Sequence, residues 1–275
     1  MKETKDKKMK DRKFEKRVLR VIRKSDILLE VLDARFAQET RNFMLEKKVQ
    51  WMGKGLIVVL NKAELISGQA LKALRLKLRR KGFVVVPVSC TERTGKNELK
   101  RAISTAEKEL GRKMQHRVSQ RGLIIGAFGY PNTGKSSLIN YLSGRGSART
   151  SAQAAFTRGE QFIRVNEGVL IIDTPGVVSF RGKPWQDLVL LNALSPNQLK
   201  DRVAAAERIV KYLLEHNRKG LAGCYGLEIA EGADPYETIE KIAVARNRLV
   251  KGGEPDIETM SRMIIADWQR GKIKV

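Results

Sequence analysis

The stretch GYPNTGKSS, residues 129–137, constrains the fold of this chain more than any other feature of its sequence. It matches the pattern G-x-x-x-x-G-K-S, with the apolar, strand-like run LIIGAFG before it and the helix-like run LINYLSG after it. Glycines allow backbone N–H groups to turn inward around phosphates at the positive end of a helix. The stretch therefore predicts a phosphate-binding loop between a strand and a helix; the alternative is an ordinary glycine-rich turn.

Two side chains of this predicted loop have expected chemical roles. Lys135 is expected to reach the β- and γ-phosphates of a nucleotide, and the Ser136 hydroxyl is expected to bind Mg²⁺. The rest of the loop and the start of the helix are expected to surround the phosphates. The residues assigned to that role are Asn132, Thr133, Gly134 and Ser137.

A second candidate motif, DTPG at residues 173–176, follows the apolar run GVLIID. Asp173 can hold Mg²⁺ through water, and the backbone N–H of Gly176 can bond the γ-phosphate and so sense its presence. Alone, such a sequence indicates only a turn. Its position after a phosphate-binding loop favours the functional interpretation.

The segment NKAE at residues 61–64 follows the apolar run GLIVVL and resembles a segment that reads a guanine base. Glu64 is expected to accept two hydrogen bonds from the guanine edge, which adenine does not offer. Lys62 is expected to pack over the base ring, Asn61 to tie the segment to the phosphate-binding loop, and Ala63 to lie between them. The plainer alternative is a helix that begins at Ala63.

All of these motifs follow predicted strands, including VSCTERTG at residues 88–95, where backbone N–H groups near Ser89 and Cys90 can meet the base carbonyl. Strand-like and helix-like runs alternate along the first two thirds of the chain, which predicts a mainly parallel sheet covered by helices. Such a sheet binds its ligand at the carboxyl ends of its strands. The motifs are therefore expected to meet at one edge.

The chain is strongly basic, with 54 Lys and Arg against 30 Asp and Glu in 275 residues. A surplus of this size predicts a polyanionic partner, and its distribution favours RNA gripped by its backbone. Few aromatic residues accompany the charges, which argues against base stacking. The alternative is a solvated charged face. The densest basic run outside the N-terminal segment contains Lys72, Arg75, Lys77, Arg79, Arg80 and Lys81.

Other classes of protein are not favoured by the composition. Cys90 and Cys224 are the only cysteines, and His116 and His216 lie far apart, so neither a disulfide framework nor a zinc cluster is expected. The apolar runs have strand length, and the basic start has no apolar core of a signal peptide. We therefore expect no membrane association and a cytoplasmic location.

Three parts of the chain are predicted. Residues 1–24 are expected to form a basic amphipathic helix, residues 25–184 an α/β domain, and residues 185–275 an all-helical domain that binds RNA. The segment GRKMQHRVSQRG, about residues 111–122, interrupts the alternation with glycines and basic residues, and is interpreted as a linker within the α/β domain.

The set NKAE, SCTE, GYPNTGKSS and DTPG resembles the motifs of Ras-like, translation-factor-class P-loop GTPases, but with the usual second half first. The chain therefore resembles the circularly permuted GTPases. VLDARFAQETRN near the start and GGEPDIETMSRMIIADWQRGKI near the end are similar to segments of the YlqF-type (RbgA-type) ribosome-assembly GTPases. The resemblance covers about residues 20–273, and the linker is where the old termini would be joined.

This resemblance implies a GTPase that binds GTP and GDP with Mg²⁺, contacts rRNA and a ribosomal subunit, and is monomeric off the ribosome. It assigns Thr157 to Mg²⁺ and the γ-phosphate. It makes Asn132 a candidate K⁺ ligand, alternatively a turn former, and implies slow turnover stimulated by the ribosomal particle and by K⁺.

Two features of the sequence keep other functions open. Val177 stands where Ras-like enzymes use a glutamine, and no histidine precedes His116, so a non-hydrolysing RNA-binding scaffold is one alternative. Glu64 replaces the usual aspartate, so an ATP-using enzyme is another.

Overall fold

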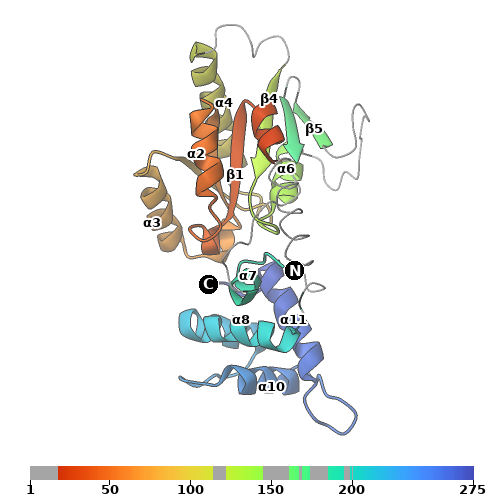
Figure 1. Ribbon diagram of the computed structural model, residues 1–275. Coiled ribbons are helices and arrows are strands. Elements are labelled where there is room, and N and C mark those ends of the chain that lie inside the picture. The colour runs from red at the N-terminus through yellow and green to blue at the C-terminus, as the bar shows by residue number, and fades with distance from the viewer. Residues whose placement is uncertain are drawn as a thin grey trace, which may run out of the picture. The chain divides into compact units, whose positions relative to one another are not determined.

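The computed structural model describes residues 18–113, 122–144, 161–166, 169–173, 185–194, 199 and 201–275 (Figure 1). The chain divides into two compact units. Unit 1 comprises residues 1–64 and 68–179, and unit 2 comprises residues 65–67 and 180–275. Each is described by itself.

Unit 1 contains a six-stranded sheet in the order β3-β2-β1-β4-β6-β5. Only β5 at the edge runs antiparallel, pairing with β6; all the other neighbouring strands are parallel. The central strand β1 pairs on one side with β2, which ends in the segment NKAE, and on the other side with β4, which leads into the phosphate-binding loop. The strands are β1 Ile27–Asp33, β2 Gly55–Asn61, β3 Val84–Val88, β4 Leu123–Phe128, β5 Gln161–Asn166 and β6 Val169–Asp173.

Helices cover both faces of this sheet, as parallel strands require. On one face, Ile27, Leu29 and Val31 of β1 point into a core shared with α4 and α6. On the other face, Leu28 packs with a helix at residues 18–24 and with α2. Besides the helix at residues 18–24, the helices described in unit 1 are η1 Ala34–Phe36, α2 Phe43–Trp51, η2 Ala63–Leu65 (Leu65 being assigned to unit 2), α3 Gly68–Arg79, α4 Lys96–Lys113 and α6 Lys135–Ser143.

The predicted linker at about residues 111–122 begins too early. Helix α4 continues to Lys113, so residues 111–113 are helical rather than irregular. Gly111 does not end the helix, because the basic and acidic residues around it propagate a helix well and the backbone freedom of one glycine costs only about 1 kcal/mol relative to alanine. Residues 114–121 lie outside the described part of the chain.

Unit 2 is helical, with α8 at its centre: α7, α9, α10 and α11 all pack against it. Its core contains Ile209 and Leu213 of α8 and the fully buried Trp268 of α11, whose indole N–H donates to the Leu190 carbonyl at 3.1 Å. Aspartate or asparagine side chains cap four of its helices. The helices are α7 Trp185–Leu190, α8 Arg202–His216, α9 Arg218–Tyr225, α10 Pro235–Ala245 and α11 Ile257–Arg270.

The N-terminal helix expected over residues 1–24 is described only from Val18. Residues 18–24 are helical, and Val18 and Ile22 are buried against the sheet. Within the described part of the chain, no helix combines the length and apolarity needed to span a membrane, and no group of three or more His, Cys, Asp or Glu is placed to hold a metal ion.

Candidate functional site

Asn61, the last residue of β2, connects three of the motifs singled out in the sequence. Its side-chain amide donates to the Thr133 carbonyl in the phosphate-binding loop at 2.7 Å. Its side-chain oxygen accepts from the Cys90 thiol at 3.4 Å. The first bond is the tie that the sequence assigned to Asn61, and Asn61 is only 2% exposed. Segments that are far apart in the chain thus meet at one buried amide.

The carboxyl ends of neighbouring strands explain this convergence. Asp33 of β1 pairs in register with Asn61 of β2, and Asn61 in turn pairs with Val88 of β3. On the other side of β1, Ala127 of β4 pairs with Asp173 of β6, two residues before the loop begins at Gly129. The motifs therefore share one edge of the sheet, which is the ligand-binding edge of an open parallel sheet.

The phosphate-binding loop has a conformation that only its glycines permit. Gly134 has φ +91°, and a Cβ at this position would lie 2.1 Å from the Asn61 side-chain nitrogen. Gly129 has φ +153°, and a Cβ there would lie 2.3 Å from the Val31 carbonyl oxygen. The glycines therefore allow both the turn and the close approach of the neighbouring strands.

Lys135 begins α6 directly after this loop and is buried. Its ammonium donates to the Tyr130 carbonyl at 2.7 Å, so it lies inside the turn of the loop. The Thr133 hydroxyl also donates to the Tyr130 carbonyl, at 2.9 Å. Ser136 and Ser137, in the first turn of α6, are exposed, and Asn132 has a left-handed backbone with φ +58°. This is a cradle that leaves the helix start accessible to a phosphate.

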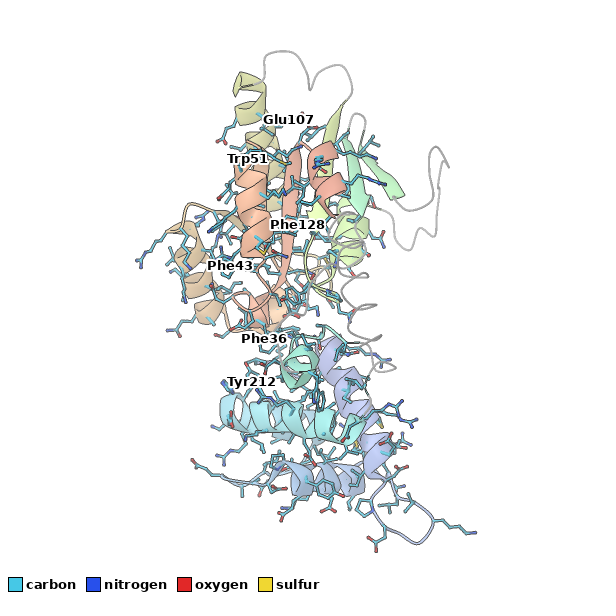
Figure 2. The ribbon with its side chains drawn as sticks, in the orientation of Figure 1. Phe36, Phe43, Trp51, Glu107, Phe128 and Tyr212 are labelled. Carbon is cyan, nitrogen blue, oxygen red and sulfur yellow. The ribbon has the colours of Figure 1, made fainter. Side chains whose placement is uncertain are left out.

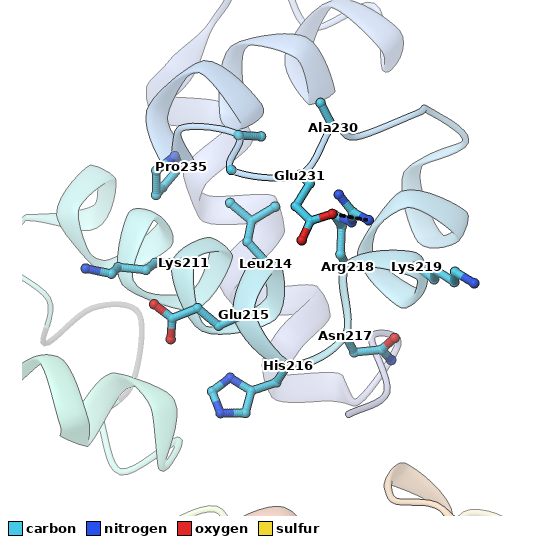
Figure 3. A pocket seen from close by; sticks show the side chains of 12 residues that line it. Lys211, Leu214, Glu215, His216, Asn217, Arg218, Lys219, Ala230, Glu231 and Pro235 are labelled. Carbon is cyan, nitrogen blue, oxygen red and sulfur yellow. Dashed lines mark ion pairs between the residues drawn. The ribbon is translucent and has the colours of Figure 1, made fainter.

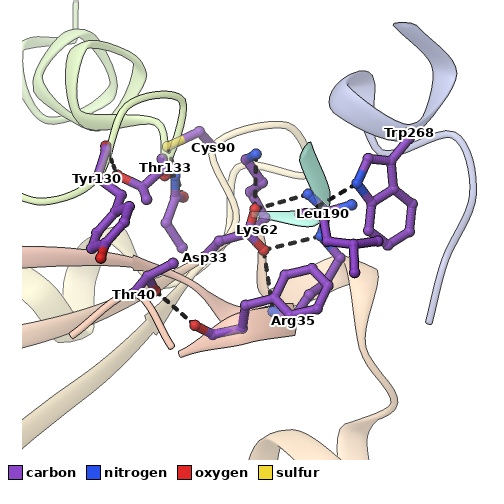
Figure 4. Close-up of polar contacts among 11 residues, drawn as sticks. Asp33, Arg35, Thr40, Lys62, Cys90, Tyr130, Thr133, Leu190 and Trp268 are labelled. Atoms are coloured by element: carbon purple, nitrogen blue, oxygen red, sulfur yellow. Dashed lines mark hydrogen bonds and ion pairs between the residues drawn. The ribbon is translucent and has the colours of Figure 1, made fainter. Parts of the chain in front are cut away.

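Lys62 is held by an ion pair with Asp33, the aspartate of the segment VLDAR. Its ammonium lies 3.0 Å from a carboxylate oxygen of Asp33, which also accepts from the Arg35 guanidinium at 2.8 Å (Figure 4). Burial alone would raise the pKa of Asp33, but Arg35 and Lys62 together lower it to about 2. Burial lowers the pKa of Lys62, and Asp33 opposes that shift. The ion pair anchors the tip of Lys62, so its aliphatic stem is the part that can lie against a base.

Glu64 lies in the short helix η2 and carries a buried carboxylate oxygen, Oε2, that has no hydrogen-bond partner within the described part of the protein. Burial, with a smaller contribution from the Glu64 charge, raises the pKa of the Cys90 thiol to about 11. Cys90 therefore stays protonated and can donate to Asn61. A buried carboxylate oxygen without a donor is unfavourable, and it fits a ligand that brings N–H groups.

The segment after β3 forms a tight turn beside Asn61. Ser89 and Thr94 exchange two backbone hydrogen bonds, and the Ser89 hydroxyl accepts from the Glu92 N–H at 2.9 Å. These bonds fix the backbone near Cys90 against the end of β2. Contact of this turn with a base carbonyl stays a prediction.

Three predicted site residues cannot be placed fully. Thr157 and Gly176 lie outside the described residues, and so does Val177. Asp173 is the last residue of β6, beside the strand that leads into the phosphate-binding loop, and only its backbone is among the described parts of the chain. The roles assigned to these residues in binding Mg²⁺ and the γ-phosphate stay predictions.

The sequence reasoning missed the role of Asp33 and Arg35 as the support of Lys62. The signal was present, because Asp33 ends a fully buried strand and Arg35 follows two residues later.

The sequence reasoning also missed a buried cluster of charged residues. Glu46 binds the Arg41 guanidinium at 2.8 and 2.5 Å, and Glu30 accepts from the Asn42 N–H at 2.8 Å. Burial, with the charge of Glu46, raises the pKa of Glu30 well above its usual value.

The basic run of α3 is exposed at most of its positions. Arg75 differs: its guanidinium makes an ion pair with Glu98 of α4 and is partly covered. Arg75 is therefore a weaker candidate for contact with a polyanion than the sequence suggested. The exposed basic residues of this run are Lys72, Lys77, Arg79, Arg80 and Lys81.

Unit 2 contains a cavity of about 580 Å³ between the end of α8, the start of α9 and the segment before α10 (Figure 3). Its lining mixes both signs of charge, and Arg218 lies 3.9 Å from Glu231. His216 stacks on Tyr212 of the same helix, with ring centroids 4.1 Å apart. None of the residues assigned to a nucleotide lines this cavity.

Comparison with known proteins relates the chain to GTP-binding proteins. Residues 124–221 match the family described as "50S ribosome-binding GTPase". The uncharacterized GTP-binding protein MJ1464 of Methanocaldococcus jannaschii is 35% identical over 93% of this chain and 65% of its own length. The nuclear GTP-binding protein NUG1 of Saccharomyces cerevisiae is 32% identical over 92% of this chain and 54% of its own. The chain spans about two fifths to two thirds of the curated relatives it matches.

The fold is that of a solved protein. The crystal structure of GNP-bound YlqF from T. maritima superposes with a TM-score of 0.63 at 23% identity, covering 95% of each chain. The family match begins in β4, and the segment NKAE lies before it. The strand order and the motif order together are those of a circularly permuted P-loop GTPase fold, as the sequence predicted.

Proposed function

We propose that this chain, a circularly permuted GTPase of the YlqF type by its fold and motif order, binds GTP and GDP, hydrolyses GTP, and acts on a ribosomal particle during subunit assembly. The observation that carries the proposal is the hydrogen bond from Asn61 to Thr133. It joins the base-reading segment to the phosphate-binding loop, so that one nucleotide can span both. Residues 25–184 form the proposed GTPase domain.

The chemistry of the site fits a guanine nucleotide. The buried, unpartnered oxygen of Glu64 would accept from the N–H groups of a guanine base, and adenine would leave that oxygen unpaired. This observation does not favour the alternative of an ATP-using enzyme, raised by the glutamate in place of aspartate, because adenine lacks the paired N–H donors of the guanine edge. Lys62, Ala63, Ser89 and Cys90 complete the proposed base pocket.

Mg²⁺ would be held by the Ser136 hydroxyl, with Asp173 and Thr157 as the further proposed ligands. When bound, it would neutralise charge on the phosphates. Lys135 is proposed to leave the Tyr130 carbonyl and bind the β- and γ-phosphates. Gly176 is proposed to bond the γ-phosphate and Asn132 to bind K⁺. The roles of Lys135, Ser136 and Asn132 rest on the loop geometry and on the resemblance. Those of Asp173, Thr157 and Gly176 rest on the sequence motifs and on the resemblance.

The proposed partner is rRNA in a ribosomal particle. The exposed cations of α3 and the basic start of the chain support a phosphate-binding surface. Relatives include proteins named nuclear/nucleolar GTPase 2, in Arabidopsis thaliana, and nuclear GTP-binding protein NUG1. Unit 2 follows the DTPG segment directly in sequence, so ordering of that segment by the γ-phosphate can bias it. The RNA-binding role of residues 185–275, the monomeric state and the cytoplasmic location stay predictions.

The deciding experiment measures GTP turnover by the purified chain with and without ribosomal subunits, in K⁺ and in Na⁺ buffer. We expect slow turnover alone and stimulation by the particle and by K⁺. Binding of GTP without turnover in every condition would favour the non-hydrolysing scaffold. Turnover of ATP at the same rate as GTP would favour the ATP-using alternative.

A second measurement tests the coupling of nucleotide to particle. Subunit affinity is measured with GDP and with a non-hydrolysable GTP analogue across a salt series. Linkage requires two factors to be equal: the factor by which replacing GDP with the GTP analogue changes subunit affinity, and the factor by which the subunit changes the ratio of analogue to GDP affinity. Such factors are typically about 5- to 150-fold. Affinity should also fall steeply with salt. Equal affinities with both nucleotides would show that the nucleotide is not the switch.

A further inference from the structure

One face of α2 presents a large aromatic side chain to solvent. Trp51 is 82% exposed and Met44 is 74% exposed. They lie seven residues apart, which is two helical turns, so they share one side of the helix. Figure 2 shows Trp51 at one end of α2 and Phe43 at the other. Tryptophan is rarely left this open in a folded protein.

The exposure of Trp51 follows from how α2 is fixed. Leu45 and Val49, on the opposite side of the helix, are buried in the core with Val18 and Ile22. Asn42 caps the helix start by accepting from the Leu45 N–H at 3.1 Å. These contacts set the rotation of α2, so Trp51 cannot turn inward without exposing the core.

Phe43 is different, although it too is exposed, because it has a use within unit 1. The Arg41 guanidinium lies between two rings, 4.5 Å from the centroid of Phe43 and 4.7 Å from that of Phe83. Phe43 therefore covers a buried cation. No ring contact of this kind involves Trp51 among the described residues.

The exposed charged side chains of α2 are positive. Lys47 lies between Met44 and Trp51 on the same side of α2 and is exposed, and Lys48 is partly exposed. The one acidic residue of this helix, Glu46, is buried and bound to Arg41. Lys54, in the turn after Trp51, donates to the Arg23 carbonyl at 2.8 Å, which ties the end of α2 to the helix at residues 18–24.

We propose that Met44, Lys47 and Trp51, here called the α2 platform, bind RNA by stacking an unpaired base on the Trp51 ring. An exposed aromatic ring beside lysines, on a helix without an exposed acidic residue, suits a base attached to phosphates. A protein partner would be favoured by a wider apolar face without this charge. The inference rests on the proposed RNA partner and refines it, since the composition had argued against base stacking.

The test compares single-stranded and double-stranded RNA of one sequence, titrated into the full chain. Trp51→Ala should weaken single-strand binding by about 5- to 150-fold, the range for loss of one base–aromatic stack. Trp51→Phe should retain most of the affinity, because the ring is kept. Duplex affinity should stay unchanged in both variants, because paired bases cannot stack on a side chain. Lys47→Ala should weaken the binding of both RNAs.

Gln50→Ala is the matched control, since Gln50 is an exposed neighbour on the same helix and outside the platform. GTP turnover and melting temperature should be the same in all these variants. Fluorescence gives a direct readout: RNA should quench the part of the emission that is lost in Trp51→Phe.

Three results would overturn the platform. Unchanged single-strand affinity in Trp51→Ala would do so, and a simultaneous change in sedimentation would identify a protein interface instead. Binding of duplex but not of single strands by the wild type would sink the platform while the RNA-binding function stands. Binding of neither RNA would remove the RNA partner and the platform together, and the turnover assay would still judge the GTPase.

Discussion

The side chain of Asn61 donates to the carbonyl of Thr133 across 72 residues of sequence. This one bond joins two segments that an unpermuted GTPase carries in the opposite order. It has a specific geometric requirement, because Asn61 occupies the space that a side chain at Gly134 would need. The base-reading and phosphate-binding functions are therefore built as one unit, and the variants below separate their parts.

The phosphate role of the loop is tested by Lys135→Ala and Ser136→Ala. We expect both variants to lose nucleotide binding or turnover, because one side chain acts on phosphates and the other on Mg²⁺. Circular dichroism and the melting temperature should show that the fold survives Ser136→Ala, since Ser136 is exposed. Undiminished turnover in both variants would disprove the assignment of the loop.

The base preference is tested by Glu64→Ala. Removing the acceptor should cost about 2–4 kcal/mol of GTP affinity, the loss of two buried hydrogen bonds to a charged group, and leave ATP affinity nearly unchanged. Competition of the two nucleotides for a fluorescent analogue measures the ratio. Glu92→Ala, an exposed glutamate in the turn after β3, is the control. A large GTP preference retained by Glu64→Ala would mean that the base is read elsewhere.

The junction itself is tested by Gly134→Ala. The new Cβ would collide with the Asn61 nitrogen at 2.1 Å, and a backbone with φ +91° is strained for alanine by about 1–3 kcal/mol. We expect the free energy of nucleotide binding to change more than the free energy of unfolding. Gly111→Ala is the matched control: Gly111 is helical with nothing within 4 Å of an added Cβ, so alanine there should stabilise by about 0.5–1 kcal/mol. Equal nucleotide affinity in the two variants would contradict the close approach.

The support beneath Lys62 is tested by Asp33→Asn. Because the pKa of Asp33 is lowered to about 2, its carboxylate contributes stability that is present above its unfolded pKa and is lost as the pH falls through about 2. The variant should lose about 2 kcal/mol at neutral pH, and the difference from wild type should shrink toward pH 2. Urea unfolding from pH 7 to pH 2 measures this. A difference independent of pH would show that the charge is not the cause.

The buried acids are tested by a pair of variants with opposite expected signs. Burial and Glu46 raise the pKa of Glu30, so its contribution to stability is present at low pH and is lost as the pH rises through the raised value. Glu30→Gln should therefore gain stability over wild type as the pH rises.

Glu46→Gln should instead lose about 3–5 kcal/mol, because Arg41 would be left as a buried charge without its carboxylate. Urea unfolding of both variants between pH 4.5 and pH 8 checks the pair. A destabilisation of Glu30→Gln that grows as the pH rises would mean that the ionised form of Glu30 is the one that stabilises the fold.

Much of this architecture follows from local patterns in the sequence. Strands β1, β2 and β6 are mainly apolar runs that end in a polar residue, and the glycines of the phosphate-binding loop mark a turn with positive φ. Asn61 was expected to reach this loop, because carboxyl ends of parallel strands meet at one edge. The end of α4 was placed too early, since a single glycine does not stop a helix of good formers.

Side-chain pairings across elements could not be predicted in the same way. The ion pair of Arg75 with Glu98 and the sandwich of Arg41 between Phe43 and Phe83 depend on how helices and strands pack. The exposure of Trp51 depends on the rotation of α2, which the loose helical pattern of its apolar residues did not determine. Such features arise from tertiary packing, which periodicity alone does not encode.

The central position of β1 has a consequence for synthesis of the chain. Strands β1, β2 and β3 with α2, α3 and α4 are contiguous in sequence, so the half that carries the base-reading segment leaves the ribosome first and can pair with itself. One edge of β1 then stays unpaired until β4 has been synthesised. When β4 pairs with it, Asp26 accepts from the Ile124 N–H across 98 residues. Closure of this long loop is the slow kind of contact formation. A nascent chain therefore completes the specificity half of the pocket before it has any means to hold a phosphate.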